Sequence, residues 1–307
     1  MVRYIVKRVA VGIFTLFILA TITFFLMHVI PGSPFAGETS NLPANVMQKL
    51  EEKYGLDKST GEQYVAYMKN VVKGDFGVSI YRKGRPITKI IGQGFPNTAK
   101  LGLVACLWAI VAGIALGTIA AFTKHKWIAS LVIFFSTIGI SVPSFLLGVL
   151  LMLLFGVTLK VLPFVGLSTP LHYILPALCL SFYPVAVISR LVKSSMQEVM
   201  KQDYMILAKS KGTPDRTVIM RHGLKNAMLP VITYVGPMFA TLLTGSFVIE
   251  SLYSIPGIGA EFVNSITNRD YTMIMALTIL YGAMIILANL LTDIVNAIVD
   301  PRIKLGK

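Results

Sequence analysis

Long runs of apolar residues, separated by shorter polar segments, dominate the pattern of this chain. Six runs can be read from the sequence, covering about 9–30, 101–122, 128–157, 171–189, 229–249 and 273–299. A helix needs about 20 apolar residues to cross the hydrocarbon core of a bilayer. The pattern therefore predicts an all-α integral membrane protein with six transmembrane helices.

The third and fourth runs are irregular. The third is too long for one straight crossing, and it contains Gly139, Pro143 and Gly148. Because helices kink at such residues or tilt when they are too long for the bilayer, we expect a kink or a tilt there. Pro176 and Pro184 interrupt the fourth run.

A polar stretch at 31–100 separates the first two runs. Its pattern predicts two helices, at about 43–54 and 60–73, followed by turns at Gly74 and Gly77. We expect this stretch to form a small cap on the outer face of the membrane, which is neither a flexible linker nor an independent domain.

Basic residues decide the orientation of the six runs. The net charge is +14, although only 14% of the residues are charged, against about 25% in soluble domains. The positive residues that flank one side are Arg3, Lys7, Arg8, Lys124, Lys126, Arg190, Lys193, Lys201, Lys209, Lys211, Arg216, Arg221, Lys225, Arg302, Lys304 and Lys307. The opposite loops, near 158–170 and 250–272, carry only Lys160 and Arg269. Since Lys and Arg gather in cytoplasmic loops, both termini are predicted in the cytoplasm. The basic residues are membrane flanks, so we expect no nucleic-acid partner.

These assignments divide the chain into four parts. They are a cytoplasmic N-terminus with the first helix at 1–30, an extracytoplasmic loop at 31–100, a membrane core at 101–299 with a cytoplasmic loop at 190–228, and a cytoplasmic tail at 300–307. A basic end before an apolar run is also the pattern of a secretory signal. The first run is about 22 residues long and no small-residue cleavage site follows it, so we expect an uncleaved helix.

One basic segment, from Asp203 to Pro230, lies between the fourth and fifth runs. Its centre predicts helix, turn, helix. Gly212 can take the left-handed conformation that ends a helix. Thr213 can cap the next helix, Pro214 suits its first position, and Asp215 complements its dipole. This bracket joins two membrane helices directly, so a partner that pushes on it would move both.

The sequence carries no pattern for catalysis or for a resident cofactor. It has no G-x-x-x-x-G-K-[ST] phosphate loop, no H-E-x-x-H pair and no Cys or His cluster with metal-ligand spacing. Cys106 and Cys179 fall inside predicted spans, where we expect buried, reduced thiols. An intramembrane protease or lipid transferase would need a nucleophile and a base, and the few His and acidic residues supply no such pair. We expect no catalytic residue, no metal and no cofactor bound by this chain.

Acidic residues are rare in the runs. Glu250 falls at the outer end of the fifth, and Asp293 toward the inner end of the sixth. Ion-coupled carriers usually bury an ionisable group near the midplane, so the pattern disfavours a secondary carrier or channel. Asn289, Asp293 and Asn296 share one helix face. That face could be a translocation surface or a polar seam against a neighbouring helix, and we prefer the seam.

The bracket resembles the cytoplasmic EAA loop in the membrane subunits of importers of the ATP-binding-cassette (ABC) superfamily. That motif reads roughly E-A-A-x-x-x-G, a spacer, then hydrophobic-x-Leu-Pro. Ala208, Gly212, Leu229 and Pro230 fall on this pattern. The two residues before Ala208 are Ile and Leu rather than Glu and Ala, which leaves open the residue that would contact an ATPase arginine.

The resemblance covers nearly the whole chain and is most specific for the B-type membrane permease subunit of bacterial oligopeptide importers. The segments that carry it are, in the order of that family, IPGSPFAGE, YGLDKSTGEQY, GDFGVS, ISVPSF, VIESLYSIPGIGAEFVNSITNRDY and NLLTDIVNAIVDPRI. Dipeptide and nickel importers have similar subunits, so these cargoes remain alternatives to oligopeptides.

This resemblance implies a type I ABC importer permease fold in the bacterial inner membrane. It implies a second, homologous permease subunit, two ATPase subunits that bind ATP and Mg, an extracytoplasmic peptide-binding protein, and membrane lipid as partners. The residues it assigns to ATPase coupling are Asp203, Ala208, Lys209, Ser210, Lys211, Gly212, Thr213, Pro214, Asp215 and Arg216. Pro256, Gly257 and Gly259 are assigned to docking of the binding protein. The residues that line the substrate path are not identified by the sequence.

Overall fold

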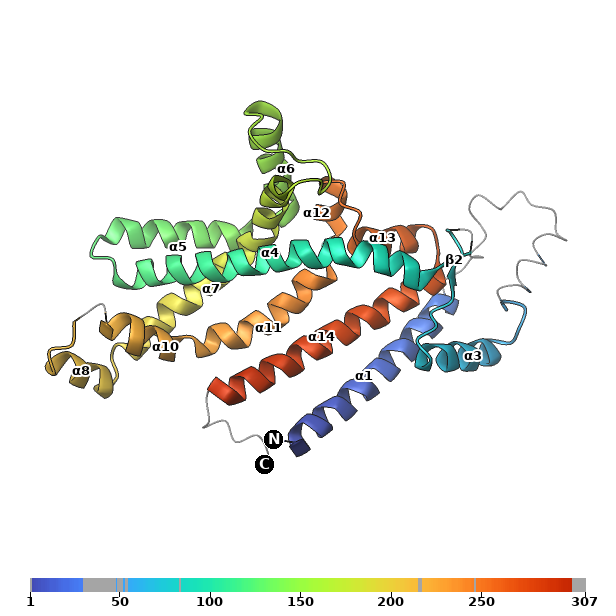
Figure 1. The fold of residues 1–307 in the computed structure, drawn as a ribbon, viewed down its shortest axis with the longest axis horizontal. Coiled ribbons are helices and arrows are strands. Elements are labelled where there is room, and N and C mark those ends of the chain that lie inside the picture. Colours follow the sequence, from blue (N-terminus) through green and yellow to red (C-terminus); the bar gives the residue numbers. More distant parts are fainter. Residues whose placement is uncertain are drawn as a thin grey trace.

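A computed structural model describes residues 2–29, 48, 52, 55–82, 84–214, 217–245 and 247–299. Long helices lie side by side and form the body of the molecule (Figure 1). They are α1 (Val2–Val29), α4 (Ile87–Phe122), α7 (Ile174–Val199), α11 (Leu229–Thr244) and α14 (Tyr271–Val299). Helix α14 packs between α1 and α11, and α4 packs along α7. The predicted all-α fold class is confirmed.

Shorter elements complete the bundle. They are the helices α3 (Thr60–Val72), α5 (Lys126–Ser141), α6 (Ser144–Leu151), α8 (Asp203–Ser210), α10 (Leu224–Ala227), α12 (Phe247–Leu252) and α13 (Ile258–Thr267), with π-helical η1 (Met152–Thr158) and η3 (Val218–Gly223) and 3-10 helical η2 (Pro170–Tyr173). Two short antiparallel strands, β1 (Val78–Ser79) and β2 (Arg85–Pro86), pair Val78 with Pro86 and Ser79 with Arg85.

Four helices of the described chain are long and apolar enough to cross a membrane, and two bent helix pairs raise that number to six. The first pair breaks between α5 and α6 with a bend of 109°, which confirms the kink predicted in the third run. Pro143 causes it, because proline lacks an N–H and holds Val142 extended, at φ −88° and ψ 125°. The second pair joins Val218–Ala227 to Leu229–Thr244 at 52°.

Two helices differ in extent from the apolar runs of the sequence. The second membrane helix begins at Ile87, not near 101, because the buried stripe of Ile87, Ile90 and Gly94 continues the helix into the outer cap. The fifth ends at Thr244, not near 249, because Gly245 takes φ +81° and turns the chain into the separate helix α12. Both differences come from tertiary contacts and a turn that the apolar runs alone do not reveal.

The outer cap agrees with the sequence where the structure describes it. Helix α3 begins after Ser59, which forms a capping box with Glu62, and the turns at Gly74 and Gly77 have positive φ. The Tyr64 hydroxyl lies 2.8 Å from that of Thr21, so α3 is fastened to the end of α1. The predicted helix at 43–54 lies outside the described residues, apart from Gln48 and Glu52, which are helical.

Close helix packing and a polar seam hold the bundle together. A Cβ at Gly113 would lie 2.7 Å from Ile188, and one at Gly117 would lie 2.6 Å from the carbonyl oxygen of Ser189. Arg8 forms an ion pair of 2.6 Å with Asp293, and Thr233 donates a hydrogen bond of 3.4 Å to Asn296. The seam interpretation of the polar face of α14 is therefore confirmed for Asp293 and Asn296. Cys106 and Cys179 are buried, free thiols, as expected.

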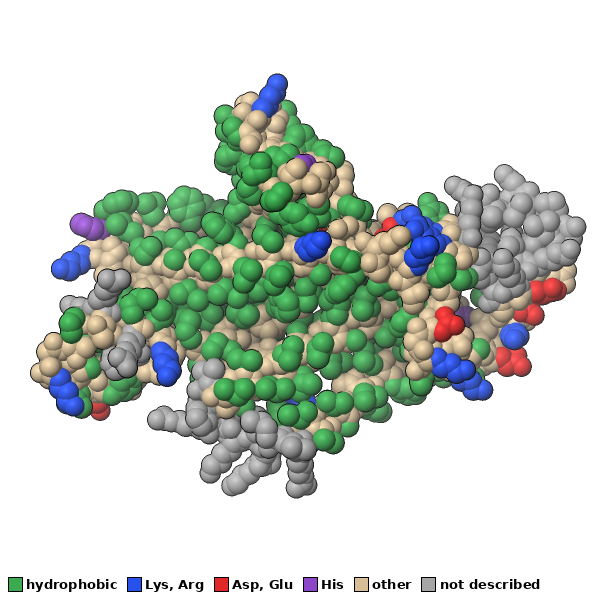
Figure 2. Space-filling view, in the orientation of Figure 1, with side chains coloured by type: hydrophobic (Ala, Val, Ile, Leu, Met, Phe, Trp, Pro, Cys, Tyr) green, Lys and Arg blue, Asp and Glu red, His purple; other side chains and the backbone are tan. Residues whose placement is uncertain are grey.

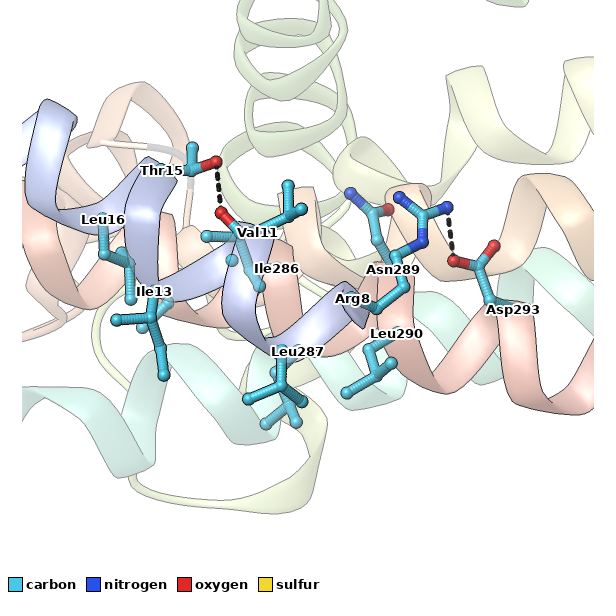
Figure 3. Close-up of a pocket in the computed structure, with 13 residues that line it drawn as sticks. Arg8, Val11, Ile13, Thr15, Leu16, Ile286, Leu287, Asn289, Leu290 and Asp293 are labelled. Atoms are coloured by element: carbon cyan, nitrogen blue, oxygen red, sulfur yellow. Dashed lines mark hydrogen bonds and ion pairs between the residues drawn. The ribbon is translucent and has the colours of Figure 1, made fainter. Parts of the chain in front are cut away.

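Hydrophobic side chains cover the middle of the face in Figure 2, and most charged side chains lie toward its ends. Figure 3 shows a hollow of about 290 Å³ between α1 and α14, with the ion pair of Arg8 and Asp293 at one end. Its other walls are mainly aliphatic.

Candidate functional site

The bracket predicted from the sequence is present as a projecting element. Helix α8 lies at the end of the molecule opposite the end that carries α3 and the strands (Figure 1). Met205 is fully buried, and α8 packs against η3, whereas Tyr204, Ile206 and Leu207 are about half exposed. Helix α8 thus presents apolar side chains at the very positions where the EAA pattern has Glu and Ala.

Gly212 ends the first arm of the bracket as predicted, with φ +76°. The N–H of Thr213 bonds to the carbonyl oxygen of Ala208 at 3.3 Å. The second arm begins at Pro214, whose carbonyl oxygen accepts from the N–H groups of Thr217 and Val218 at 2.9 and 3.0 Å. This pattern closes helical turns on both sides of the glycine.

The other predicted coupling residues lie along the same segment. Asp203 starts α8, and Ser210 ends it with a hydroxyl that bonds to the carbonyl oxygen of Ile206 at 3.0 Å. Lys211 is exposed. Asp215, Arg216 and the side chain of Lys209 lie outside the described residues.

At the opposite end, Glu250 organises the segment that contains the predicted docking residues. Its carboxylate accepts hydrogen bonds from the Thr98 hydroxyl at 2.8 Å and the Ala260 N–H at 2.9 Å, and only 1% of the residue is exposed. Burial raises the pKa of the Glu250 carboxyl, while these hydrogen bonds lower it. The Thr98 hydroxyl also accepts from the Ile258 N–H at 3.0 Å.

The two glycines assigned to docking pack against this carboxylate. A Cβ at Gly257 would lie 2.4 Å from Glu250 Oε2, and one at Gly259 would lie 3.0 Å from it. Both glycines are buried, and only Pro256 of the three is exposed. The docking assignment stays a prediction, and the glycines have a packing role that the sequence pattern did not suggest.

Glu250 is the residue that sequence reasoning missed. The sequence predicts it at the outer end of the fifth span, whereas it lies in the separate helix α12, where its carboxylate is buried and bonds to the start of α13. The glycines that follow Glu250 in the sequence could have revealed its burial, because small residues are needed where the backbone packs on a side chain.

Asp270 plays a similar part beside the strands. Its carboxylate accepts hydrogen bonds from the hydroxyls of Ser79 and Thr272. Arg82, in the turn after β1, pairs with Glu261 of α13. The outer cap is thus bound to the segment that Glu250 organises, and the two form one platform.

A hollow of about 630 Å³ opens between α6, α7 and α11. We call it the tyrosine hollow after Tyr183 and Tyr234. The residues around it are Ser144, Leu180, Tyr183, Pro184, Tyr234, Pro237, Met238, Thr241, Leu242, Gly245 and Phe247, and none of these is charged. Three prolines surround it, since Pro143 precedes α6, Pro184 lies inside α7 and Pro237 lies inside α11. Two of the helices around the hollow, α7 and α11, thus carry a proline in their interior.

Two family models match the chain. The model described as binding-protein-dependent transport system inner membrane component matches residues 113–305, and the N-terminal membrane-component model of the same system matches residues 1–102.

Curated relatives align along the full length. The dipeptide transport system permease protein DppB of Lactococcus lactis is 42% identical, over 99% of this chain and 100% of that protein. The DppB of Bacillus subtilis is 41% identical, over 100% of this chain and 99% of that protein. The oligopeptide transport system permease protein OppB of Escherichia coli K12 is 42% identical, over 99% of this chain and 100% of that protein.

Solved structures share the fold at low identity. A chain of the inward-facing MetNI methionine ABC transporter superposes with a TM-score of 0.55 at 16% identity, over 69% of this chain and 97% of that one. An amino acid ABC transporter determined with histidines gives a TM-score of 0.54 at 15% identity, over 68% and 94%. The likeness identifies the type I importer permease fold.

Proposed function

This chain belongs to the family of binding-protein-dependent transport system inner membrane components, and we propose that, as a permease subunit of an ATP-driven importer, it forms half of the path for oligopeptides. The observation that carries this proposal is full-length identity of 41–42% to peptide permeases. Relatives named for dipeptides and for oligopeptides are equally similar, so dipeptide cargo is the nearest alternative.

The chain forms part of the transport path and depends on partner ATPases to drive transport. Its sequence has no phosphate-binding loop, so ATP and Mg are bound by two partner ATPases. A second, similar permease completes the path, and an extracytoplasmic binding protein delivers the peptide. The chain itself performs no chemistry and holds no cofactor.

Helix α8 is the element that receives force from an ATPase. It projects from the bundle, it is anchored by the buried Met205, and it shows Ile206 and Leu207 to the exterior. An apolar contact in an ATPase groove takes the place of the acidic contact of the EAA motif. Because the turn at Gly212 is short and both arms lead into membrane helices, a displacement of α8 moves α7 and α11 as rigid bodies.

Reconstitution tests this function directly. We expect peptide uptake into liposomes that hold this chain, its partner permease, both ATPases and the binding protein, and we expect it to require ATP. The control replaces the phosphate-binding lysine of the ATPases. Uptake driven by a proton gradient without ATP would instead indicate an ion-coupled carrier, and uptake of nickel without peptide would indicate the metal-chelate alternative. Peptides of two to five residues, compared side by side, separate dipeptide from oligopeptide cargo.

A further inference from the structure

The position of Tyr183 within α7 singles out the tyrosine hollow. At 1.5 Å per residue, Tyr183 lies about 14 Å from the first residue of α7 and about 24 Å from the last. Tyrosines of membrane proteins gather at the two interfaces, where the hydroxyl meets water. Half of Tyr183 is exposed, yet it lies far from either end of its helix.

Neither tyrosine hydroxyl makes a hydrogen bond with any part of the chain that the structure describes. In hydrocarbon, each would lack a partner and would be costly to hold there. Pro184 and Pro237 lie inside α7 and α11, where each removes a backbone donor, and at membrane depth the carbonyl freed in this way needs a partner from a neighbouring helix, a side chain or water. These two observations indicate that the hollow faces water or protein and not lipid.

The size and lining of the hollow suit a polar, hydrated cargo. Its 630 Å³ has room for about 20 waters at about 30 Å³ each. The hydroxyls of Ser144 and Thr241 join those of the tyrosines on its wall. A peptide main chain offers N–H donors and C=O acceptors along its length. A hydroxyl can pair with both, because it can accept and donate a hydrogen bond.

We propose that the tyrosine hollow is this subunit's wall of the peptide path, where the Tyr183 and Tyr234 hydroxyls contact the peptide main chain. This inference rests on the proposed function. Because the wall carries no charge, acidic, basic and neutral peptides pass it alike. Selection by charge therefore does not occur in this subunit.

Charge placed on the wall tests the inference. Two charges about 4 Å apart in water interact by an amount equal to about a fivefold change. We expect Thr241→Asp to raise the ratio of basic to acidic tripeptide uptake by about fivefold or more, and Thr241→Lys to lower it by as much. Thr241→Asn is the neutral control, and the same two charges at Thr267, an exposed residue of α13, control for surface electrostatics.

A thiol-labelling experiment tests the water-lined surface without transport. In complexes in lipid nanodiscs, with Cys106 and Cys179 replaced by Ala, we expect Tyr183→Cys to react with a charged methanethiosulfonate. Val111→Cys, on an exposed position of α4, should not react.

If the Thr241 variants still import peptides but show equal uptake of basic and acidic tripeptides, the inference is overturned while the proposed function stands. Labelling of Tyr183→Cys no faster than that of Val111→Cys would overturn the inference too. A wild-type complex without ATP-dependent uptake would instead refute the proposed function.

Discussion

Gly212 sets the local conformation of the bracket, which we propose to be the coupling element. Its φ of +76° is unfavourable for a side chain by about 1–2 kcal/mol, although a Cβ there would have no neighbour within 4 Å. The cost of Gly212→Val is therefore backbone strain and not a clash. We expect reduced peptide uptake and reduced binding-protein-stimulated ATPase activity, with normal amounts of the subunit in the membrane.

Gly212→Asn is the matched control, because asparagine enters the left-handed region more readily than other residues. It should retain most of both activities. Full activity in Gly212→Val would show that the bracket does not carry the coupling.

Glu250 is a residue whose importance is structural. Glu250→Ala would leave two donors, the Thr98 O–H and the Ala260 N–H, without their acceptor in a buried site. Each unsatisfied group costs about 1–3 kcal/mol, and each kcal/mol lowers the melting temperature by about 2–4 °C in a chain of 150–250 residues. We expect the purified complex to melt at least about 4 °C lower. Glu250→Gln keeps one acceptor oxygen and the volume, so its loss should be clearly smaller. Identical melting of Glu250→Ala and wild type would contradict this role.

At the scale of elements, a Gly→Ala substitution is expected to have opposite effects at two glycines of α4. Gly117 meets α7 so closely that Gly117→Ala would place a Cβ 2.6 Å from the Ser189 carbonyl oxygen. Backbone cannot yield as a flexible side chain does, so we expect poor assembly. Gly92, in the same helix, has nothing within 4 Å of a Cβ, and Gly92→Ala should stabilise the helix by up to about 1 kcal/mol. Size-exclusion profiles and melting temperatures of the two variants check this contrast, and similar behaviour of both would refute it.

The elements also show what the sequence could and could not predict. The apolar runs, the kink at Pro143 and the turn at Gly212 follow from local chemistry, so they were predictable. The start of α4 at Ile87 and the end of α11 at Thr244 depend on contacts with distant segments. The burial of Glu250 and the tyrosine hollow arise only when three or more elements come together, and single-helix patterns carry no information on that arrangement. Pro184 was expected to interrupt a helix, yet α7 continues through it, because helices in membranes tolerate proline where neighbours satisfy the backbone.

At the scale of the whole molecule, the bracket and the outer cap lie at opposite ends of the bundle (Figure 1). The membrane must therefore separate them if the long helices cross it. From the basic flanking residues we propose that the bracket lies in the cytoplasm. Two exposed residues mark the ends, namely Lys58, before α3, and Lys211, after α8.

Single cysteines at these two positions determine the orientation. In a background with Cys106 and Cys179 replaced by Ala, an impermeant maleimide added to intact spheroplasts should label Lys58→Cys and spare Lys211→Cys. Permeabilised cells should label both, which shows that each thiol is reactive. Both lysines are exposed, and the side chain of neither makes a hydrogen bond within the described part of the chain, so the substitutions leave the capping box of α3 and the turn at Gly212 intact. Labelling of Lys211→Cys alone in intact spheroplasts would invert the topology, and it would remove α8 from the reach of any cytoplasmic ATPase.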